Sequence, residues 1–129
     1  MRHASIWTIG PDGLPRIATD HPRIDAATAR RVVDYLRAGR VVVATTARVR
    51  DVLDSSVLAL VGLSTRCDNE WSWDDTLLYY VENHLLSPGQ EFLDYLTQRT
   101  FTPNPPSAEA VAHVLSNFDN PHQRSSHEM

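Results

Sequence analysis

The chain of 129 residues is long enough for one domain to bury a hydrophobic core without disulfides or metal ions. Its 42% apolar and 22% charged residues are ordinary for a soluble globular protein, and no run approaches the roughly 20 apolar residues of a membrane span. A single Cys excludes an internal disulfide, and the first residues contain no apolar signal segment, so we expect a cytoplasmic protein.

The net charge of −4 is unevenly distributed along the chain. All twelve basic residues are Arg; residues 1–50 carry nine of them against four Asp, whereas residues 51–129 carry three against twelve Asp and Glu. This asymmetry predicts an acidic face that repels nucleic acid and favours a basic protein partner, although it also suits an inert dipolar surface.

The first forty residues predict a hairpin and a helix. Residues 4–9 and 14–19 are typical of strands, and a Gly-Pro-Asp-Gly turn separates them. Asp25 is a suitable N-cap for a helix over residues 26–38, and Gly39 is a suitable residue to end it. The apolar stripe of this helix is expected to face the core and consists of Ala29, Val32, Val33 and Leu36.

The middle of the chain predicts two central strands, then a short strand and a second helix. The β-branched run 41–46 is typical of a strand, residues 48–56 indicate a polar loop or a single helical turn, and the apolar run 57–65 predicts a second strand. The helix that follows the short strand is expected over residues 75–86.

The short strand contains two tryptophans and follows a turn. Asp68 and Asn69 both tolerate positive φ, so they predict a tight turn. Trp71 and Trp73 alternate with Ser72, which places both indoles on one face of a sheet. Asp74 then serves as a plausible N-cap for the second helix.

The last third predicts two more helices and a tail. Ser87 with Gln90 forms a capping box at the start of a helix whose buried residues are Phe92, Leu93 and Leu96. Residues 100–106 contain three Pro and exclude regular structure. Ser107 caps a last helix that ends near residue 118, with Val111, Val114, Leu115 and Phe118 facing inward.

This order, ββαβββααα, predicts a single α+β domain over residues 1–118 and a flexible tail over residues 119–129. We expect a mostly antiparallel sheet of about five strands, with the helices packed over one face.

The sequence contains no specific catalytic or metal-binding motif. Cys67 precedes Asp68, whose charge raises the pKa of a thiol, so a structural thiol is expected. The six His lack the spacings of metal ligands, so neither a metal nor another cofactor is predicted.

The helix over residues 75–86 is the predicted partner-binding element. Its buried stripe should be Leu77, Leu78, Val81 and Leu85. Its opposite side then presents an aromatic residue among polar and acidic ones, a typical contact surface for a basic partner, made of Asp75, Tyr79, Glu82 and Asn83. The alternative is that Tyr79 packs beneath the third helix.

The same region, with its D-N-x-W-x-W-x-D motif, Tyr-Tyr pair, His and Pro, resembles a group of small, mostly actinobacterial proteins of unassigned activity. The matching residues are Asp68, Asn69, Trp71, Trp73, Asp74 or Asp75, Tyr79, Tyr80, His84 and Pro88. The group usually has Gly at Asn69 and Ser or Thr at Asp74. The resemblance implies a shared structural unit and no particular reaction.

Two functions remain open. The first is a non-enzymatic, cytoplasmic protein-binding module, such as an inhibitor or immunity-type protein that docks an acidic, aromatic face on a basic partner. The alternative is a small enzyme with a pocket beside the Trp pair, built from Glu70, Asp74, Asp75, Tyr80 and His84. A deep, closed pocket there favours the enzyme, and a flat acidic surface favours the binding module.

Overall fold

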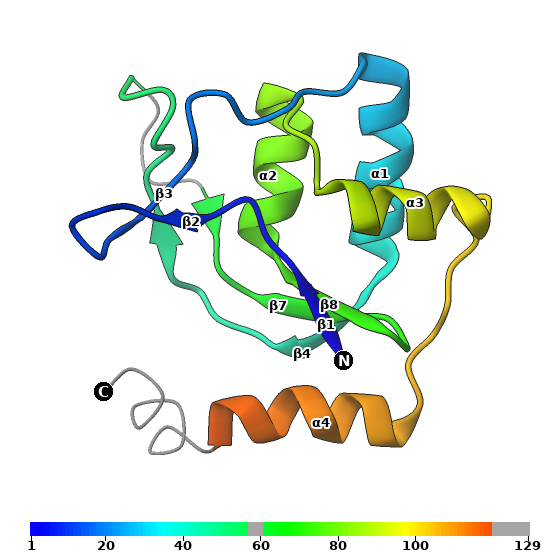
Figure 1. Ribbon diagram of the computed structural model, residues 1–129. Helices are drawn as coiled ribbons and strands as arrows, with labels where there is room; N and C mark the ends of the chain where they lie inside the picture. The colour runs from blue at the N-terminus through cyan, green and yellow to red at the C-terminus, as the bar shows by residue number, and fades with distance from the viewer. Residues whose placement is uncertain (57–60, 120–129) are drawn as a thin grey trace.

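A four-stranded sheet organises the protein (Figure 1). In the computed structural model, which describes residues 1–56 and 61–119, the strands lie in the order β1-β8-β7-β4. Their bounds are Arg2–Ala4 for β1, Trp71–Asp74 for β8, Thr65–Cys67 for β7 and Arg40–Val43 for β4. The β8–β7 and β7–β4 pairs are antiparallel, whereas β1 runs parallel to β8.

In the described part of the chain, two small two-stranded ribbons accompany the sheet. Strand β2 (Thr8–Ile9) pairs with β3 (Pro15–Arg16) as the predicted hairpin, and β5 (Arg48–Val49) pairs with β6 (Val61–Gly62). The predicted first strand, residues 4–9, is divided between two sheets. Its first residue belongs to β1, which joins the main sheet, and its last two residues form β2 of the hairpin. The predicted strand 57–65 is also divided: residues 57–60 lie outside the described residues, and β6 and β7 belong to different sheets.

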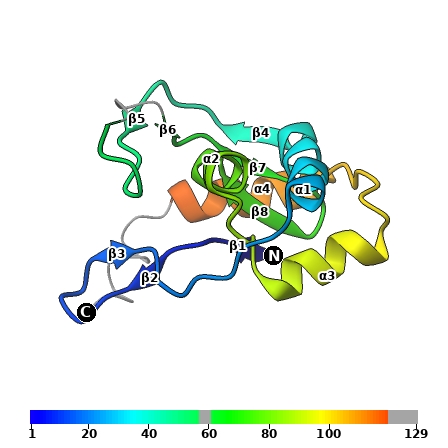
Figure 2. The same cartoon turned by 90° about the horizontal axis from the view of Figure 1, so that it is seen from above.

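Within the described residues, four helices flank the sheet: α1 (Ala26–Ala38), α2 (Asp75–His84), α3 (Gln90–Gln98) and α4 (Ala108–Asp119). Helices α1, α2 and α3 lie over one face, and α4 lies across the other (Figures 1 and 2). The α+β class predicted from the sequence is confirmed. The placement of α4 differs from the expected single layer, because the connection between residues 99 and 107 leads the chain around the edge of the sheet.

Both tryptophans of β8 point into the core beneath α1 and α3, as predicted. Trp73 is fully buried and Trp71 is 6% exposed. The Trp73 indole Nε1 donates to the Leu36 carbonyl oxygen at 3.2 Å. A Cβ at Gly39 would lie 2.4 Å from the Trp73 ring, so only glycine allows this close approach at the end of α1.

The start of α1 follows the prediction, and the start of α3 does not. Asp25 Oδ1 accepts the Thr28 amide at 2.7 Å, which caps α1 and lowers the pKa of Asp25. Helix α3 begins two residues later than its predicted first helical residue: Gly89 is the N-cap with a φ of +103°, and Ser87 Oγ accepts only the Gly89 amide. The cap of α4 is as predicted, with Ser107 Oγ accepting the Ala110 amide at 3.1 Å.

No helix in the described part of the chain is both long and apolar enough to cross a membrane. The predicted tail lies outside the described residues from position 120 onward.

Candidate functional site

A groove of about 800 Å³ opens between α3 and α4 beside the start of β1 and β8. Among the residues that the structure describes, its walls carry four exposed carboxylates, namely Glu70, Glu91, Asp94 and Glu109. The lining also includes the indole of Trp71 and the half-buried ring of Tyr95. Arg2 is the only Arg among the described residues that line it. The groove therefore combines an aromatic floor with a strongly acidic rim.

The floor is fixed by packing among aromatic rings. The Trp71 ring centroid lies 4.9 Å from that of Phe92 and 6.0 Å from that of Tyr95. The guanidinium carbon of Arg2 lies over the indole, 4.7 Å from its centroid, and Arg2 also forms an ion pair with Glu91. A cation thus already occupies part of the groove.

Beneath this floor, Asp68 joins three elements by hydrogen bonds. Its Oδ2 accepts the hydroxyls of Tyr35 at 2.6 Å and Tyr95 at 2.7 Å. Its Oδ1 accepts the backbone amides of Glu70 at 2.8 Å and Trp71 at 2.7 Å. Burial, followed by the bond to Asp68, raises the pKa of Tyr35, so its hydroxyl remains a donor.

The predicted turn at Asp68 and Asn69 forms, but not through the positive φ that these residues tolerate. Neither Asp68 nor Asn69 adopts positive φ. The turn forms instead because the Asp68 carboxylate accepts the amides two and three residues ahead, an Asx-type arrangement.

The connection from α3 to α4 is attached to this turn. The Asn69 amide donates to the Asn104 carbonyl oxygen at 3.0 Å, and Asn69 Oδ1 accepts the Ser107 amide at 2.9 Å. The Asn104 side-chain amide donates to Tyr95 at 3.0 Å and to Glu70 Oε2 at 3.2 Å. The turn before β8 is therefore hydrogen-bonded to both helices that form the groove, to α3 through Tyr95 and to the start of α4 through Ser107.

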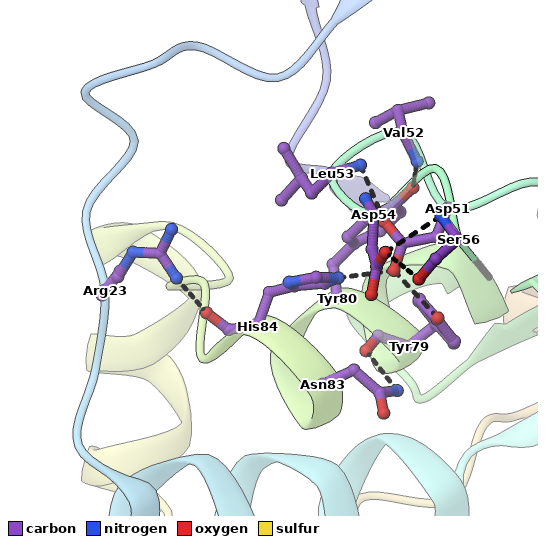
Figure 3. A network of polar contacts seen from close by, with 10 residues as sticks. All are labelled: Arg23, Asp51, Val52, Leu53, Asp54, Ser56, Tyr79, Tyr80, Asn83 and His84. Carbon is purple, nitrogen blue, oxygen red and sulfur yellow. Dashed lines mark hydrogen bonds and ion pairs between the residues drawn. The ribbon is translucent and has the colours of Figure 1, made fainter.

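A second polar network lies on α2 and involves three residues of the predicted motif, Tyr79, Tyr80 and His84 (Figure 3). Asp51, which is 3% exposed, accepts from Tyr79 at 2.9 Å and lies 2.5 Å from His84 Nε2 through its Oδ2. Its Oδ1 accepts the backbone amides of Leu53 and Asp54. Burial alone would raise the pKa of Asp51, but the bonds from His84, the Leu53 amide and Tyr79 together lower it.

This network holds the segment 51–56 against α2. The Tyr80 hydroxyl accepts the Val52 amide at 2.8 Å, and the His84 ring stacks on Tyr80 with centroids 5.6 Å apart. No Ser, Thr or Cys hydroxyl or thiol of the described residues is bonded to the His84 ring, so the Asp–His pair lacks the nucleophile that such a pair activates in hydrolases. Its contacts support a structural role.

The predicted contact surface on α2 is largely engaged within the chain. Asp75 pairs with Arg66 at 2.8 Å, and Glu82 pairs with Arg37 at 3.0 Å. Tyr79 was expected to project outward, but its ring is half-buried and its hydroxyl reaches Asp51. Burial and then that hydrogen bond raise the pKa of Tyr79 to about 12. The Asn83 side-chain amide donates to the Tyr79 carbonyl oxygen.

The residues of the predicted enzyme pocket are dispersed. Glu70 lines the groove, Asp75 pairs with Arg66, and Tyr80 and His84 belong to the Asp51 network. Asp74 is the N-cap residue of α2, as predicted, but its side chain makes no capping hydrogen bond. Its Oδ1 accepts the Thr65 hydroxyl at 2.8 Å instead, because the end of β8 places it beside β7.

The described residues show no reactive thiol or metal cluster. Cys67 is fully buried, and burial followed by the charge of Asp68 raises the pKa of its thiol. No three His, Cys, Asp or Glu in the described ranges are placed to hold a metal ion.

The groove was not predicted from the sequence, although the spacing of some of its residues follows a helix face. Glu91, Asp94 and Tyr95 have the i, i+3, i+4 spacing of one helix face, opposite the buried side of α3. Glu109 comes from α4, and only the tertiary fold brings it to the same groove.

No family model, curated protein or solved structure matches the chain significantly.

Proposed function

We propose that the protein is a non-enzymatic binding module that docks a basic protein partner in the groove between α3 and α4. The observation that carries this proposal is the excess of carboxylates around an aromatic floor. Four acidic side chains surround Trp71 and Tyr95, and Arg2 is the one guanidinium among the described lining residues. An inhibitor or immunity-type role is the form of this function that an acidic binding face best fits.

The described residues neutralise only part of the charge of the groove. Among the described residues, only Glu91 of the four carboxylates has an ion-pair partner. Asp94 and Glu70 accept from the neutral amides of Gln90 at 2.8 Å and Asn104 at 3.2 Å. Exposed, unpaired carboxylates attract a basic partner over distance and accelerate its association.

The aromatic floor supplies apolar contact area, which the carboxylates do not provide. Aromatic residues at the centre of an interface contribute most of the contact energy, and a polar rim excludes water from them. Trp71 and Tyr95 are held in place by Phe92 and by Asp68, so few rotors are frozen on binding. The groove therefore offers both a rigid contact area and charge complementarity.

The test is a fluorescence titration of the protein with labelled hexa-arginine as the probe. Neutralising two groove carboxylates, by Asp94→Asn with Glu109→Gln, should weaken binding about tenfold, which is about 1.4 kcal/mol. The matched control neutralises two carboxylates of α2, by Asp75→Asn with Glu82→Gln, and therefore changes the net charge equally. This control should stay within about twofold of the parent, because both of its acids are already ion-paired.

Equal losses in both double variants would reduce the effect to net charge and overturn the groove as the binding site. A larger loss in the α2 variant would return the site to the face formed by Asp75, Tyr79, Glu82 and Asn83.

A further inference from the structure

We infer that the groove recognises an arginine side chain stacked on Trp71, and that Arg2 holds this position in the free protein until a partner arginine displaces it. This inference rests on the proposed function. It adds the identity of the recognised group and an internal competitor for it.

The position of the Arg2 side chain, over Trp71 and beside Glu91, has the geometry of a guanidinium-binding site. Its guanidinium carbon lies 4.7 Å from the centroid of the Trp71 ring, within the range of a cation–π contact. The same guanidinium pairs with Glu91, so it contacts both the floor and the acidic rim. Stacking of a planar group on an indole and pairing with a carboxylate favour arginine over lysine.

The backbone of Arg2 is fixed independently of its side chain. Arg2 is opposite Trp71 in the parallel β1–β8 pair, and its amide donates to the Glu70 carbonyl oxygen at 3.1 Å. The side chain can therefore leave the indole without unfolding β1.

The side-chain contacts of Arg2 are weak enough to be replaced. The side chains of Arg2 and Glu91 are 60% and 71% exposed, and exposed ion pairs contribute little because solvent screens them. With Arg2 in place, Trp71 is only 6% exposed. A partner arginine that takes this position must therefore compete with Arg2. Its apparent affinity equals the intrinsic affinity multiplied by the fraction of molecules in which the Arg2 side chain has left the indole.

The experiment compares Arg2→Gln with the parent in titrations with hexa-arginine and, separately, hexa-lysine. Arg2→Gln should bind hexa-arginine about fivefold more tightly than the parent does, with a smaller gain for hexa-lysine. Arg2→Lys, which keeps the charge but loses the planar group, should fall between the parent and Arg2→Gln.

The control is Arg16→Gln. Arg16 is also an exposed arginine in an ion pair, with Asp12 at 2.7 Å, but it lies in the β2–β3 hairpin away from the groove lining. It alters the net charge equally and should leave both titrations unchanged.

The outcomes separate this inference from the proposed function. Equal gains in Arg2→Gln and Arg16→Gln, or weaker binding in Arg2→Gln, overturn the displacement of Arg2 while groove binding stands. An absence of hexa-arginine binding in the parent and in Arg2→Gln overturns the proposed function and this inference together.

Discussion

The acidic face of α2 and the groove between α3 and α4 contain similar side chains and differ in how their charge is balanced. On α2, Asp75 and Glu82 each have an arginine partner, Arg66 and Arg37. In the groove, three of four carboxylates have no ion-pair partner among the described residues. Acidic composition alone therefore does not identify a binding surface; the position of the nearest arginines does.

The two regions also differ in the support beneath them. The groove rests on Asp68, which joins α1, α3 and the turn before β8. The segment 51–56 is held through Asp51 against the side of α2 that carries Tyr79 and His84, whereas Glu82 and Asn83 remain exposed. The first arrangement leaves a groove above packed aromatic rings, and the second leaves part of α2 covered by the chain and the rest as an exposed, ion-paired surface.

The largest expected effect concerns the support of the groove. Asp68→Ala should lower the free energy of unfolding by about 3 kcal/mol or more, because it leaves the buried hydroxyl of Tyr35, the half-buried hydroxyl of Tyr95 and two backbone amides without this acceptor. Asp75→Ala, the matched change on α2, removes one partly buried ion pair with Arg66 and should cost about 1–2 kcal/mol. Chemical denaturation measures both, and equal costs would remove the distinction between the two regions.

A second, smaller effect concerns the support of α2 and depends on pH. Asp51→Asn should destabilise the protein by about 1–3 kcal/mol near neutral pH, because an amide accepts fewer of the existing bonds. The pKa of Asp51 is lowered in the folded protein, so its ionised form stabilises the fold above the unfolded-state pKa of about 3.9. This contribution is lost as the pH falls through the lowered folded-state pKa.

The difference between parent and Asp51→Asn should therefore close below about pH 4, as measured by urea unfolding at several pH values. A difference that persists unchanged at lower pH would mean that packing, and not ionisation, underlies the cost of the substitution.

The third effect concerns the unbalanced charge of the groove. Raising NaCl from about 50 to about 500 mM should weaken hexa-arginine binding about tenfold, because salt screens exposed charges. The Asp94→Asn, Glu109→Gln variant should show a clearly shallower dependence, and the Asp75→Asn, Glu82→Gln variant should follow the parent. If all three proteins share one slope, the groove carboxylates do not contribute to attraction.

The sequence predicted the elements that depend on local patterns. The alternation of Trp71 and Trp73, the Asp25 cap and the Ser107 cap all involve residues within a few positions of one another. The start of α3 was misplaced because Gly89 takes a positive φ that the capping-box pattern at Ser87 does not encode.

The parts that could not be predicted depend on distant residues. Arg66 and Arg37 neutralise α2 from β7 and α1, and Asp51 captures Tyr79 from 28 residues away. The groove likewise needs α4 on the opposite face of the sheet from α3, which periodicity does not specify. The residues on each helix face were thus predictable, whereas the distant residues of the same chain that contact each face were not.

The smallest expected effect is on α2 and tests whether its charges are already satisfied. Glu82→Gln removes the ion pair between Glu82 and Arg37, whose side chains are 44% and 53% exposed, respectively. Solvent screens such a pair, so the free energy of unfolding should change by no more than about 0.5 kcal/mol. Hexa-arginine affinity should also stay within about twofold of the parent, because Glu82 lies outside the groove lining. Thermal melting and the same fluorescence titration measure the two quantities. A loss of affinity close to that of the groove variant would show that the α2 face receives the partner despite its internal ion pairs, and the contrast between the two surfaces would fail.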